Sequence, residues 1–185
     1  AQALSNAGYE VEETEPPAVV EAAALWSSLV FSEIRTVMLP VMRPLLSRDA
    51  ATFLDLALAS VPALDLLGYQ TALAARSGIA RQWTQFHDRY PLVLGPVSTA
   101  PPFPIGTDIA SQESVARVVE SMRLVLLVNL LGLPAASVPV GVGIDDGLPQ
   151  GVQLIGDRYQ ESRCLDAAQA IEERVGTITP IDPVF

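Results

Sequence analysis

The amino-acid sequence predicts an α/β fold, in which helices alternate with short buried strands. Two observations lead to this prediction. Apolar residues recur at helical spacing over long stretches, and Ala18–Leu39 and Leu66–Tyr90 are the clearest of these. Short apolar runs bounded by proline, glycine or turn residues are typical of buried strands, and three are present: Leu92–Leu94, Ala135–Val140 and Gly151–Ile155.

The first half of the chain is predicted to hold one short strand among helices. A helical pattern at Ala3–Ala7 ends at Gly8, and Tyr9–Glu13 then alternates in the manner of a strand. In the long helix Ala18–Leu39 the apolar stripe, which includes Trp26, is followed by Pro40 and Pro44, and these prolines are expected to break the helix. A second helix, Ala50–Ser60, precedes the long helix Leu66–Tyr90.

The second half is predicted to form a loop, a helix, a hairpin and a last helix. Four prolines make Gly95–Gly106 an extended loop. Ser111 can cap the next helix, and one stripe of that helix is expected to carry Val115, Val118, Met122, Val125 and Asn129. The turn Asp145–Asp146–Gly147 joins the last two strands, and a final helix running from Cys164 to Val175 ends at Gly176.

Composition excludes several classes of partner. A formal net charge of −10 over 185 residues argues against nucleic acid and against anionic membranes, because both attract basic surfaces. The apolar run Leu124–Val142 contains glycine and two prolines, which fit a helix, turn and strand better than a membrane span. Cys164 is the single cysteine and cannot form an internal disulfide. We therefore expect a soluble, cytoplasmic protein.

Few residues of the sequence suggest catalysis. His87 is the only histidine, no G-x-S-x-G sequence exposes a nucleophile, and we interpret His87 as a surface or interface residue. One histidine and one cysteine far apart do not give the spacing of a metal site, so neither a metal nor a cofactor is expected. The glycines between Gly141 and Gly147 are interpreted as a strand end and turn, and Ser27–Ser28 as ordinary helix serines.

Asn129 is the polar residue that stands out, because it lies on an apolar stripe and is expected to be buried. A buried amide must find hydrogen-bond partners. It could tie the end of its helix to the following turn, or it could lie near a substrate amide. Both interpretations remain open from the sequence alone.

Two segments near the end of the chain resemble the carboxy-terminal region of the amidase signature family. Asn129–Gly141 reads NLLGLPAASVPVG and Gly147–Gly156 reads GLPQGVQLIG, and both are similar to motifs of that family. Phe86–Pro102 resembles the segment in which a strand of the family reaches a proline-rich loop beside the substrate pocket. The resemblance implies that residues 1–185 are the carboxy-terminal portion of an amidase domain, incomplete as a folding unit. The implied fold is part of an α/β/α sandwich with a mixed sheet.

The family hydrolyses amides through an acyl-serine intermediate and a Ser–Ser–Lys triad, and no catalytic residue of that triad can be assigned to this chain. All 11 basic residues are arginine, no lysine is present, and no glycine- and serine-rich nucleophile segment is found. The resemblance implies one wall of an acyl pocket that holds a small-molecule amide, and the candidate wall residues are Ser98, Thr99, Phe103, Val125 and Asn129.

Three hypotheses for the function follow. The chain is an inactive part of a larger amidase, a natural small subunit that completes a partner chain, or a non-catalytic binding module. The start at Ala1 within a helical pattern and the hydrophobic content of 50% favour the first hypothesis, in which the partner is the amino-terminal portion of the same enzyme. A homodimer is a further expected assembly. The glutamine-dependent tRNA amidotransferase subunit is a relative within the family that these motifs do not separate from general amidases.

Overall fold

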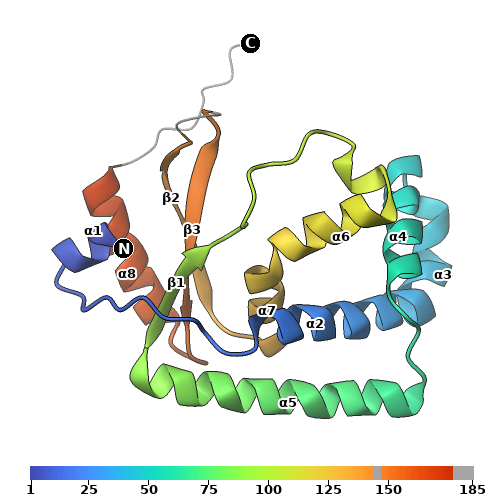
Figure 1. The fold of residues 1–185 in the computed structure, drawn as a ribbon, viewed down its shortest axis with the longest axis horizontal. Coiled ribbons are helices and arrows are strands. Elements are labelled where there is room, and N and C mark those ends of the chain that lie inside the picture. The colour runs from blue at the N-terminus through green and yellow to red at the C-terminus, as the bar shows by residue number, and fades with distance from the viewer. Residues whose placement is uncertain (144–146, 177–185) are drawn as a thin grey trace. The chain divides into compact units, whose positions relative to one another are not determined.

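The computed structural model describes residues 1–143 and 147–176, which divide into two compact units (Figure 1). Unit 1 comprises Ala1–Pro16, Gln85–Val97 and Gly132–Phe185, and unit 2 comprises Pro17–Thr84 and Ser98–Leu131. Each unit is therefore assembled from segments that are far apart in the sequence. The two units are described separately below.

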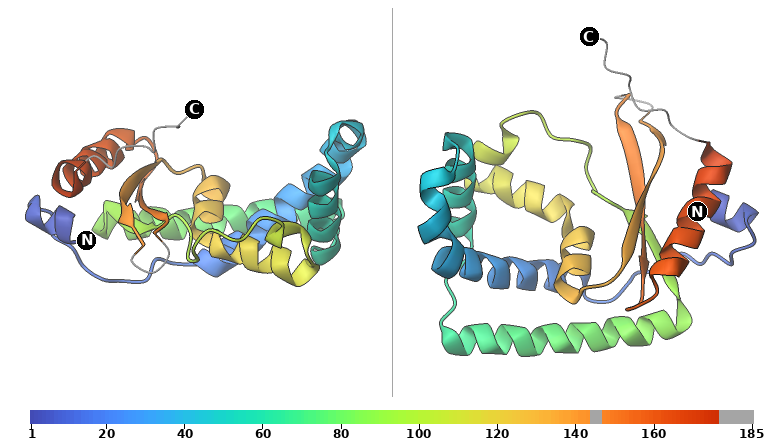
Figure 2. Two further views of the ribbon diagram at one scale, coloured as in Figure 1. Left: turned by 90° about the horizontal axis from the view of Figure 1, so that it is seen from above. Right: turned by 180° about the vertical axis from the view of Figure 1, so that it is seen from behind.

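Unit 1 is built on a three-stranded sheet with helices on one face. β1 (Leu92–Pro96) and β2 (Ala135–Val142) each pair antiparallel with the central strand β3 (Pro149–Gly156). Helices α1 (Gln2–Asn6) and α8 (Glu161–Val175) lie on the same side of this sheet (Figure 2). Their shared core consists of Leu4, Val138, Leu154, Ala167 and Ile171.

The α/β class predicted from the sequence is confirmed by this arrangement, as are the three strands and the pairing of the last two. A mixed sheet, which was expected, contains both parallel and antiparallel strand pairs. Both strand pairs among the described residues are antiparallel, so these residues show only the antiparallel part of such a sheet. Of the predicted turn Asp145–Asp146–Gly147, the two aspartates lie outside the described residues. Gly147 has φ of +65°, a conformation that favours glycine at the end of a hairpin turn.

The predicted strand Tyr9–Glu13 is wrong. This segment is extended but joins no strand ladder among the described residues, and the side chains of Tyr9 and Val11 are exposed. It is attached through side chains instead. The Glu12 carboxylate accepts from Tyr90 Oη at 2.7 Å and lies 3.3 Å from an Arg89 guanidinium nitrogen. Alternation of apolar and charged residues predicts the extended backbone but not whether a neighbouring strand is there to pair with it.

Unit 2 is helical. It contains α2 (Val19–Glu33), α4 (Arg48–Ser60), most of α5 (Leu66–Arg89), α6 (Gln112–Ser121) and α7 (Arg123–Leu131), with a short 3-10 turn η3 (Thr107–Ile109) before α6. α2 packs along α7, and α4 packs against α6. Phe31, Ala57 and Val115 form a buried cluster that joins α2, α4 and α6.

The expected break at Pro40 is also wrong. After α2 the chain continues as a π-helical turn, η1 (Ile34–Met38), then as α3 (Leu39–Met42) and the 3-10 turn η2 (Arg43–Leu45). Pro40 follows the π-helical turn without an interruption, and the Leu39 N–H bonds the Ile34 carbonyl oxygen five residues back. A π-helical turn is one way in which a helix continues past a proline, whose missing N–H disrupts the regular i→i−4 pattern. Extended backbone begins only at Leu46, just after Pro44.

The helical run Val19–Leu45 is long and apolar enough to cross a membrane by length and composition, with 22% of its most apolar window buried. Core helices of water-soluble proteins satisfy the same criteria.

The single helix predicted after Ser111 is instead two helices. The Ser111 cap is confirmed, since its hydroxyl accepts from the Ser114 backbone N–H at 3.1 Å. α6 ends at Ser121, and Met122 leaves the helical conformation at φ −99° and ψ 9°. The residues expected on one stripe are therefore divided between α6, which carries Val115 and Val118, and α7, which carries Val125 and Asn129.

A close contact between β3 and α8 provides a test of the packing in unit 1. A Cβ added to Gly156 would lie 2.9 Å from Cys164 Sγ and 3.3 Å from the Gln160 carbonyl oxygen. We predict that Gly156→Ala lowers the free energy of unfolding by about 1–3 kcal/mol, and that adding Cys164→Ala restores part of the loss. Urea denaturation measures both.

Gly78 is the matched control, because a Cβ added there, within α5, meets nothing within 4 Å. Gly78→Ala is expected to raise the free energy of unfolding by about 0.5–1 kcal/mol through helix propensity. Unfolding of Gly156→Ala at the wild-type urea concentration would contradict the close contact.

Candidate functional site

The five predicted wall residues all lie in unit 2, on the proline-rich loop and on α7. Ser98 forms a local turn, in which its hydroxyl donates to the Ala100 carbonyl oxygen at 2.9 Å. Phe103 projects from the loop with 36% of its surface exposed. Val125 is half-buried and lies one helical turn before Asn129.

Thr99 has a structural contact that its sequence position does not reveal. Its backbone N–H donates to the Ser121 carbonyl oxygen at 2.9 Å, and its hydroxyl donates to the same oxygen at 3.3 Å. In an unbroken helix that oxygen would accept from the N–H four residues later. Thr99 therefore takes the place of a helical donor at the end of α6 and fixes the proline-rich loop to the α6–α7 junction.

Asn129 is exposed, so its predicted burial is wrong. The break at Met122 changes which side of α7 is covered, and the buried residues of this helix are Leu124, Leu126, Leu127, Leu130 and Leu131. The need for a partner is met all the same. Asn129 Oδ1 accepts from the indole Nε1 of Trp26 on α2 at 2.6 Å.

The carboxy-terminal end of α7 is anchored from α5. Arg76 Nε donates to the Leu130 carbonyl oxygen at 2.5 Å, and Gly132 follows with φ of +65°. Carbonyl oxygens in the last turn of a helix lack helical partners, so an arginine placed there stabilises the end. α7 is thus held by Thr99 at the preceding junction and by Arg76 at its end.

Trp26 is the residue of this region that the sequence interpretation did not assign to the site. The sequence placed it on the apolar stripe of its helix, which is the usual role of a large aromatic residue. In the structure Trp26 is half-buried, and its ring contacts Phe31 edge-on, with centroids 6.1 Å apart. A partly buried indole N–H requires a hydrogen-bond acceptor, and this requirement is the feature from which a polar contact of Trp26 could have been predicted.

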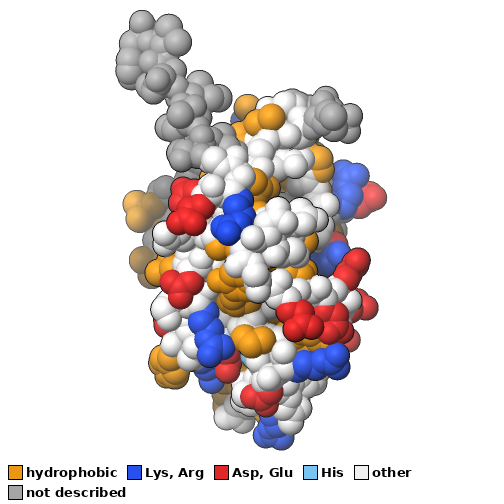
Figure 3. Space-filling model, turned by 90° about the vertical axis from the view of Figure 1, so that its left-hand side faces the viewer, with side chains coloured by type: hydrophobic (Ala, Val, Ile, Leu, Met, Phe, Trp, Pro, Cys, Tyr) orange, Lys and Arg blue, Asp and Glu red, His pale blue; other side chains and the backbone are white. Residues whose placement is uncertain are grey.

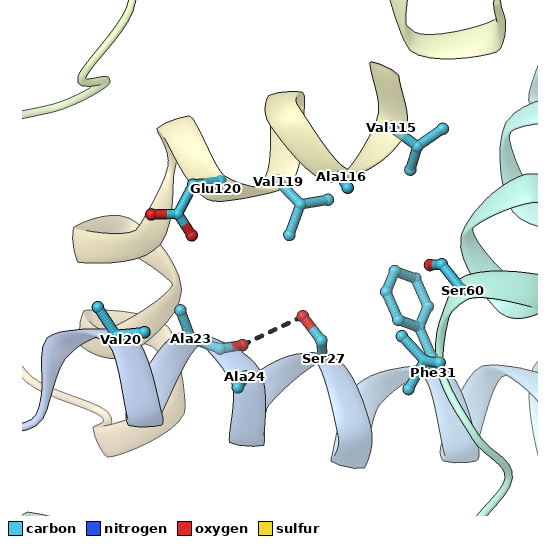
Figure 4. Close-up of a pocket in the computed structure, with 11 residues that line it drawn as sticks. Val20, Ala23, Ala24, Ser27, Phe31, Ser60, Val115, Ala116, Val119 and Glu120 are labelled. Carbon is cyan, nitrogen blue, oxygen red and sulfur yellow. Dashed lines mark hydrogen bonds between the residues drawn. The ribbon is translucent and has the colours of Figure 1, made fainter. Parts of the chain in front are cut away.

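A cavity of about 240 Å³ lies between α2, α6 and the end of α4 in unit 2 (Figure 4). Its walls are mainly alanine and valine, with Phe31 and Ser60 toward one end and Glu120 toward the other. Glu120 is paired with Arg123 at 2.6 Å. None of the five predicted wall residues lines this cavity, so the structure does not gather them around it.

The three residues considered as nucleophile or base, Ser27, Ser28 and His87, have structural roles. Ser27 Oγ donates to the Ala23 carbonyl oxygen at 3.1 Å, and Ser28 Oγ to that of Ala24 at 3.0 Å, as ordinary helix serines do. His87 is 5% exposed, so its interpretation as a surface residue is wrong. Its Nδ1 lies 2.9 Å from the Tyr90 carbonyl oxygen, which can only accept, so Nδ1 carries the proton.

A second cavity, of about 310 Å³, lies in unit 1 between the extended segment Tyr9–Pro16 and the apolar side chains of β1. Three glutamates, Glu10, Glu12 and Glu13, contribute to its lining. The hydrogen bond from Tyr90 Oη to Glu12 is the main cause that raises the pKa of Tyr90 above the usual tyrosine value. The cavity combines apolar walls with carboxylates but contains none of the predicted wall residues.

Charged residues do not form a single-signed field on the face that contains α1 and α8. In Figure 3 acidic and arginine side chains alternate around a central apolar area. Within residues 1–143 and 147–176, no group of three histidine, cysteine or carboxylate side chains lies close enough to hold a metal ion. Burial raises the pKa of the Cys164 thiol, which keeps it protonated near neutral pH.

Solved structures of an amidase and of an amidotransferase subunit share this fold. A crystal structure of an amidase superimposes with a TM-score of 0.71 at 22% identity, over 95% of this chain and 40% of that chain. A glutamyl-tRNA(Gln) amidotransferase subunit from Thermotoga maritima gives a TM-score of 0.63 at 25% identity, over 93% of this chain and 36% of that chain.

The model of the Amidase family matches residues 1–165, and the chain belongs to this family. Indoleacetamide hydrolase of Bradyrhizobium diazoefficiens is 36% identical over 95% of this chain and 33% of its own length. A glutamyl-tRNA(Gln) amidotransferase subunit of Exiguobacterium sibiricum is 34% identical over 58% of this chain and 22% of its own length. The chain thus spans about a third of the length of the indoleacetamide hydrolases that it matches.

The contact between Arg76 and the end of α7 can be tested by substitution. We predict that Arg76→Met lowers the free energy of unfolding by about 1.5–3 kcal/mol, because the Leu130 carbonyl oxygen loses a charged donor. Arg81→Met is the control, since Arg81 is exposed on the same helix and is expected to change stability by less than about 0.5 kcal/mol. Equal losses in urea denaturation would rule out a specific role for Arg76.

The Tyr90–Glu12 hydrogen bond predicts a pH dependence. The pKa of Tyr90 is raised in the folded state, so the contribution of this bond to stability is complete below the unfolded tyrosine value of about 10. It is lost as pH rises through the folded pKa. Glu12→Gln removes the charged acceptor, and NMR of ¹³C-labelled tyrosine should then show Tyr90 titrating at lower pH than in the wild type. An unchanged titration would contradict the hydrogen bond.

Proposed function

We propose that this chain is part of an enzyme that hydrolyses a carboxylic amide through an acyl-serine intermediate, with the nucleophile and its base outside residues 1–185. Membership of the Amidase family over residues 1–165 is the observation that supports the reaction class. The absence of lysine from the sequence supports the second part, because a Ser–Ser–Lys triad needs one. The chain contributes sheet, outer helices and part of the pocket wall.

The proposed reaction has two steps. The serine oxygen attacks the amide carbonyl carbon, the C–N bond breaks, and the amine leaves with a proton, so that an ester to the serine remains. Water then attacks the acyl carbon of the ester. The bond between this carbon and the serine oxygen breaks, which releases the carboxylic acid and returns the proton to the serine hydroxyl. This chain helps to position the acyl group of the substrate relative to the serine.

A small-molecule amide is the proposed substrate class. The match to the indoleacetamide hydrolase extends over 95% of the chain, whereas the amidotransferase subunit matches over 58%. The net charge of −10 also disfavours a surface of this chain dedicated to tRNA. An aromatic acetamide is therefore the first substrate to test. Cytoplasmic localisation and a homodimer remain part of the same proposal.

The test compares this chain with the complete polypeptide that contains it. We predict that residues 1–185 alone release no ammonia from indole-3-acetamide, phenylacetamide or acetamide. The complete polypeptide should release ammonia and the carboxylic acid, and added hydroxylamine should divert the acyl group to a hydroxamate. Failure with all three amides, or activity of residues 1–185 alone, would contradict the proposal.

An intact-mass measurement in the native source distinguishes the remaining alternative. A polypeptide no heavier than residues 1–185 would identify a natural subunit, and the serines and lysine would then be sought on a partner chain. A heavier polypeptide that contains this sequence would place them in the same chain. The enzymatic assay is then made on the assembly that the mass identifies.

A further inference from the structure

The cavity of about 240 Å³ in unit 2 lies between two helices that face each other with small apolar side chains. α6 contributes Val115, Ala116 and Val119, and α2 contributes Ala23 and Ala24 (Figure 4). Water in such a space finds few hydrogen-bond partners, so its replacement by an apolar group is favourable.

The two hydroxyls of the lining are occupied. Ser27 Oγ donates to the Ala23 carbonyl oxygen at 3.1 Å, and Ser60 Oγ donates to the Ala57 carbonyl oxygen at 2.7 Å. Since both hydroxyl protons are used within the helices, neither is available to a ligand. The walls therefore select for an apolar group.

One end of the cavity is fixed by the core of unit 2. Phe31 and Val115 line the cavity and also belong to the buried cluster with Ala57 that joins α2, α4 and α6. The Phe31 ring is 5% exposed and contacts Trp26 edge-on. A ligand thus meets walls that are already in place, which reduces the free-energy cost of binding.

The volume of the cavity matches a two-ring aromatic group. A cavity of about 150 Å³ lined by apolar side chains holds benzene. In proportion, about 240 Å³ suits a group of roughly nine or ten heavy atoms, which is the size of a fused pair of rings such as indole.

Glu120 adds one hydrogen-bond acceptor at the end of the cavity away from Phe31 (Figure 4). Its Oε1 accepts from Arg123 Nη1 at 2.6 Å. Among the residues that the structure describes, no donor bonds to Oε2. An N–H on the edge of a bound ring can therefore donate to this second oxygen.

We propose that this cavity binds an uncharged two-ring aromatic group with an N–H donor, such as indole, and that the N–H donates to Glu120 Oε2. Two sources supply such a ring: the acyl side group of the substrate amide, or a separate small molecule. In the first case Ala116 and Glu120 are specificity-determining residues, and the inference then rests on the proposed function.

Indole itself is the probe, and the protein is the complete polypeptide. Addition of indole should shift the ¹³C-methyl resonances of Val119, assigned by their loss in Val119→Ile, because an aromatic ring changes the magnetic field at nearby methyl groups. Half-saturation is expected at about 1 mM indole or less.

Ala116→Leu places a larger side chain in the cavity. Ala116 is exposed on α6, so the substitution does not overpack the core, and it should weaken indole binding at least about fivefold. Ala74→Leu is the matched control, because Ala74 is exposed on α5 and does not line the cavity. It should leave indole binding unchanged, and urea denaturation shows that both variants are folded.

1-Benzothiophene tests the hydrogen bond to Glu120, because it has the shape of indole but no N–H. The affinity for indole relative to 1-benzothiophene should fall about 2- to 12-fold in Glu120→Met, which lacks the acceptor. The same relative affinity in the wild type and in Glu120→Met would overturn the assignment of Glu120.

Hydrolysis of indole-3-acetamide separates the two sources of the ring. If the ring belongs to the substrate, indole raises KM without a change in kcat, and Ala116→Leu raises KM for indole-3-acetamide but not for acetamide, which has no ring. If the ring belongs to a separate molecule, indole binds and KM is unchanged.

Two results would overturn the inference: no shift of the Val119 resonances with indole, or equal indole binding by Ala116→Leu and Ala74→Leu. Indole binding requires no turnover. A wild type that hydrolyses no amide would therefore overturn only the proposed function.

Discussion

The carbonyl oxygens at the ends of α4, α6 and α7 need hydrogen-bond donors that the helices themselves cannot supply. In unit 2, one or two carbonyl oxygens at each of these three helix ends accept hydrogen bonds from a residue of another segment. Arg35 donates to the carbonyl oxygens of Leu58 and Val61 at 2.5 and 2.9 Å, beside the end of α4. Thr99 and Arg76 do the same for α6 and α7. In a sequence without lysine, arginine supplies the charged donors, and Nη2 of Arg35 alone donates to both oxygens.

These terminal contacts determine what α7 exposes. If α6 continued through Met122 as one helix, Asn129 would share a stripe with Val115 and Val118, as the sequence pattern indicates. The bond from Thr99 to Ser121 ends α6 and lets α7 begin in a new direction, with Leu127 and Leu131 buried and Asn129 exposed. A loop residue therefore sets the accessibility of a side chain on the next helix.

Sequence periodicity was sufficient for the helices and strands but not for their junctions. The proline- and glycine-bounded runs predicted all three strands of the sheet, because a short buried strand leaves a local pattern. The end of α6 depends on Thr99, which lies 22 positions away from Ser121, and no local pattern encodes such a contact. Tyr9–Glu13 was misread as a strand for the same reason, since its outcome depends on a distant partner. Membership of the family was readable because LPAASVPVG and GLPQGVQLIG are contiguous motifs.

Among the candidate wall residues, the sequence could identify Asn129 as exceptional but could not say which of its atoms would be free. That property follows from Trp26, which is 103 positions away and was interpreted as core. An amide side chain is ambiguous in its chemistry because it both donates and accepts, and a donor-only neighbour removes the ambiguity.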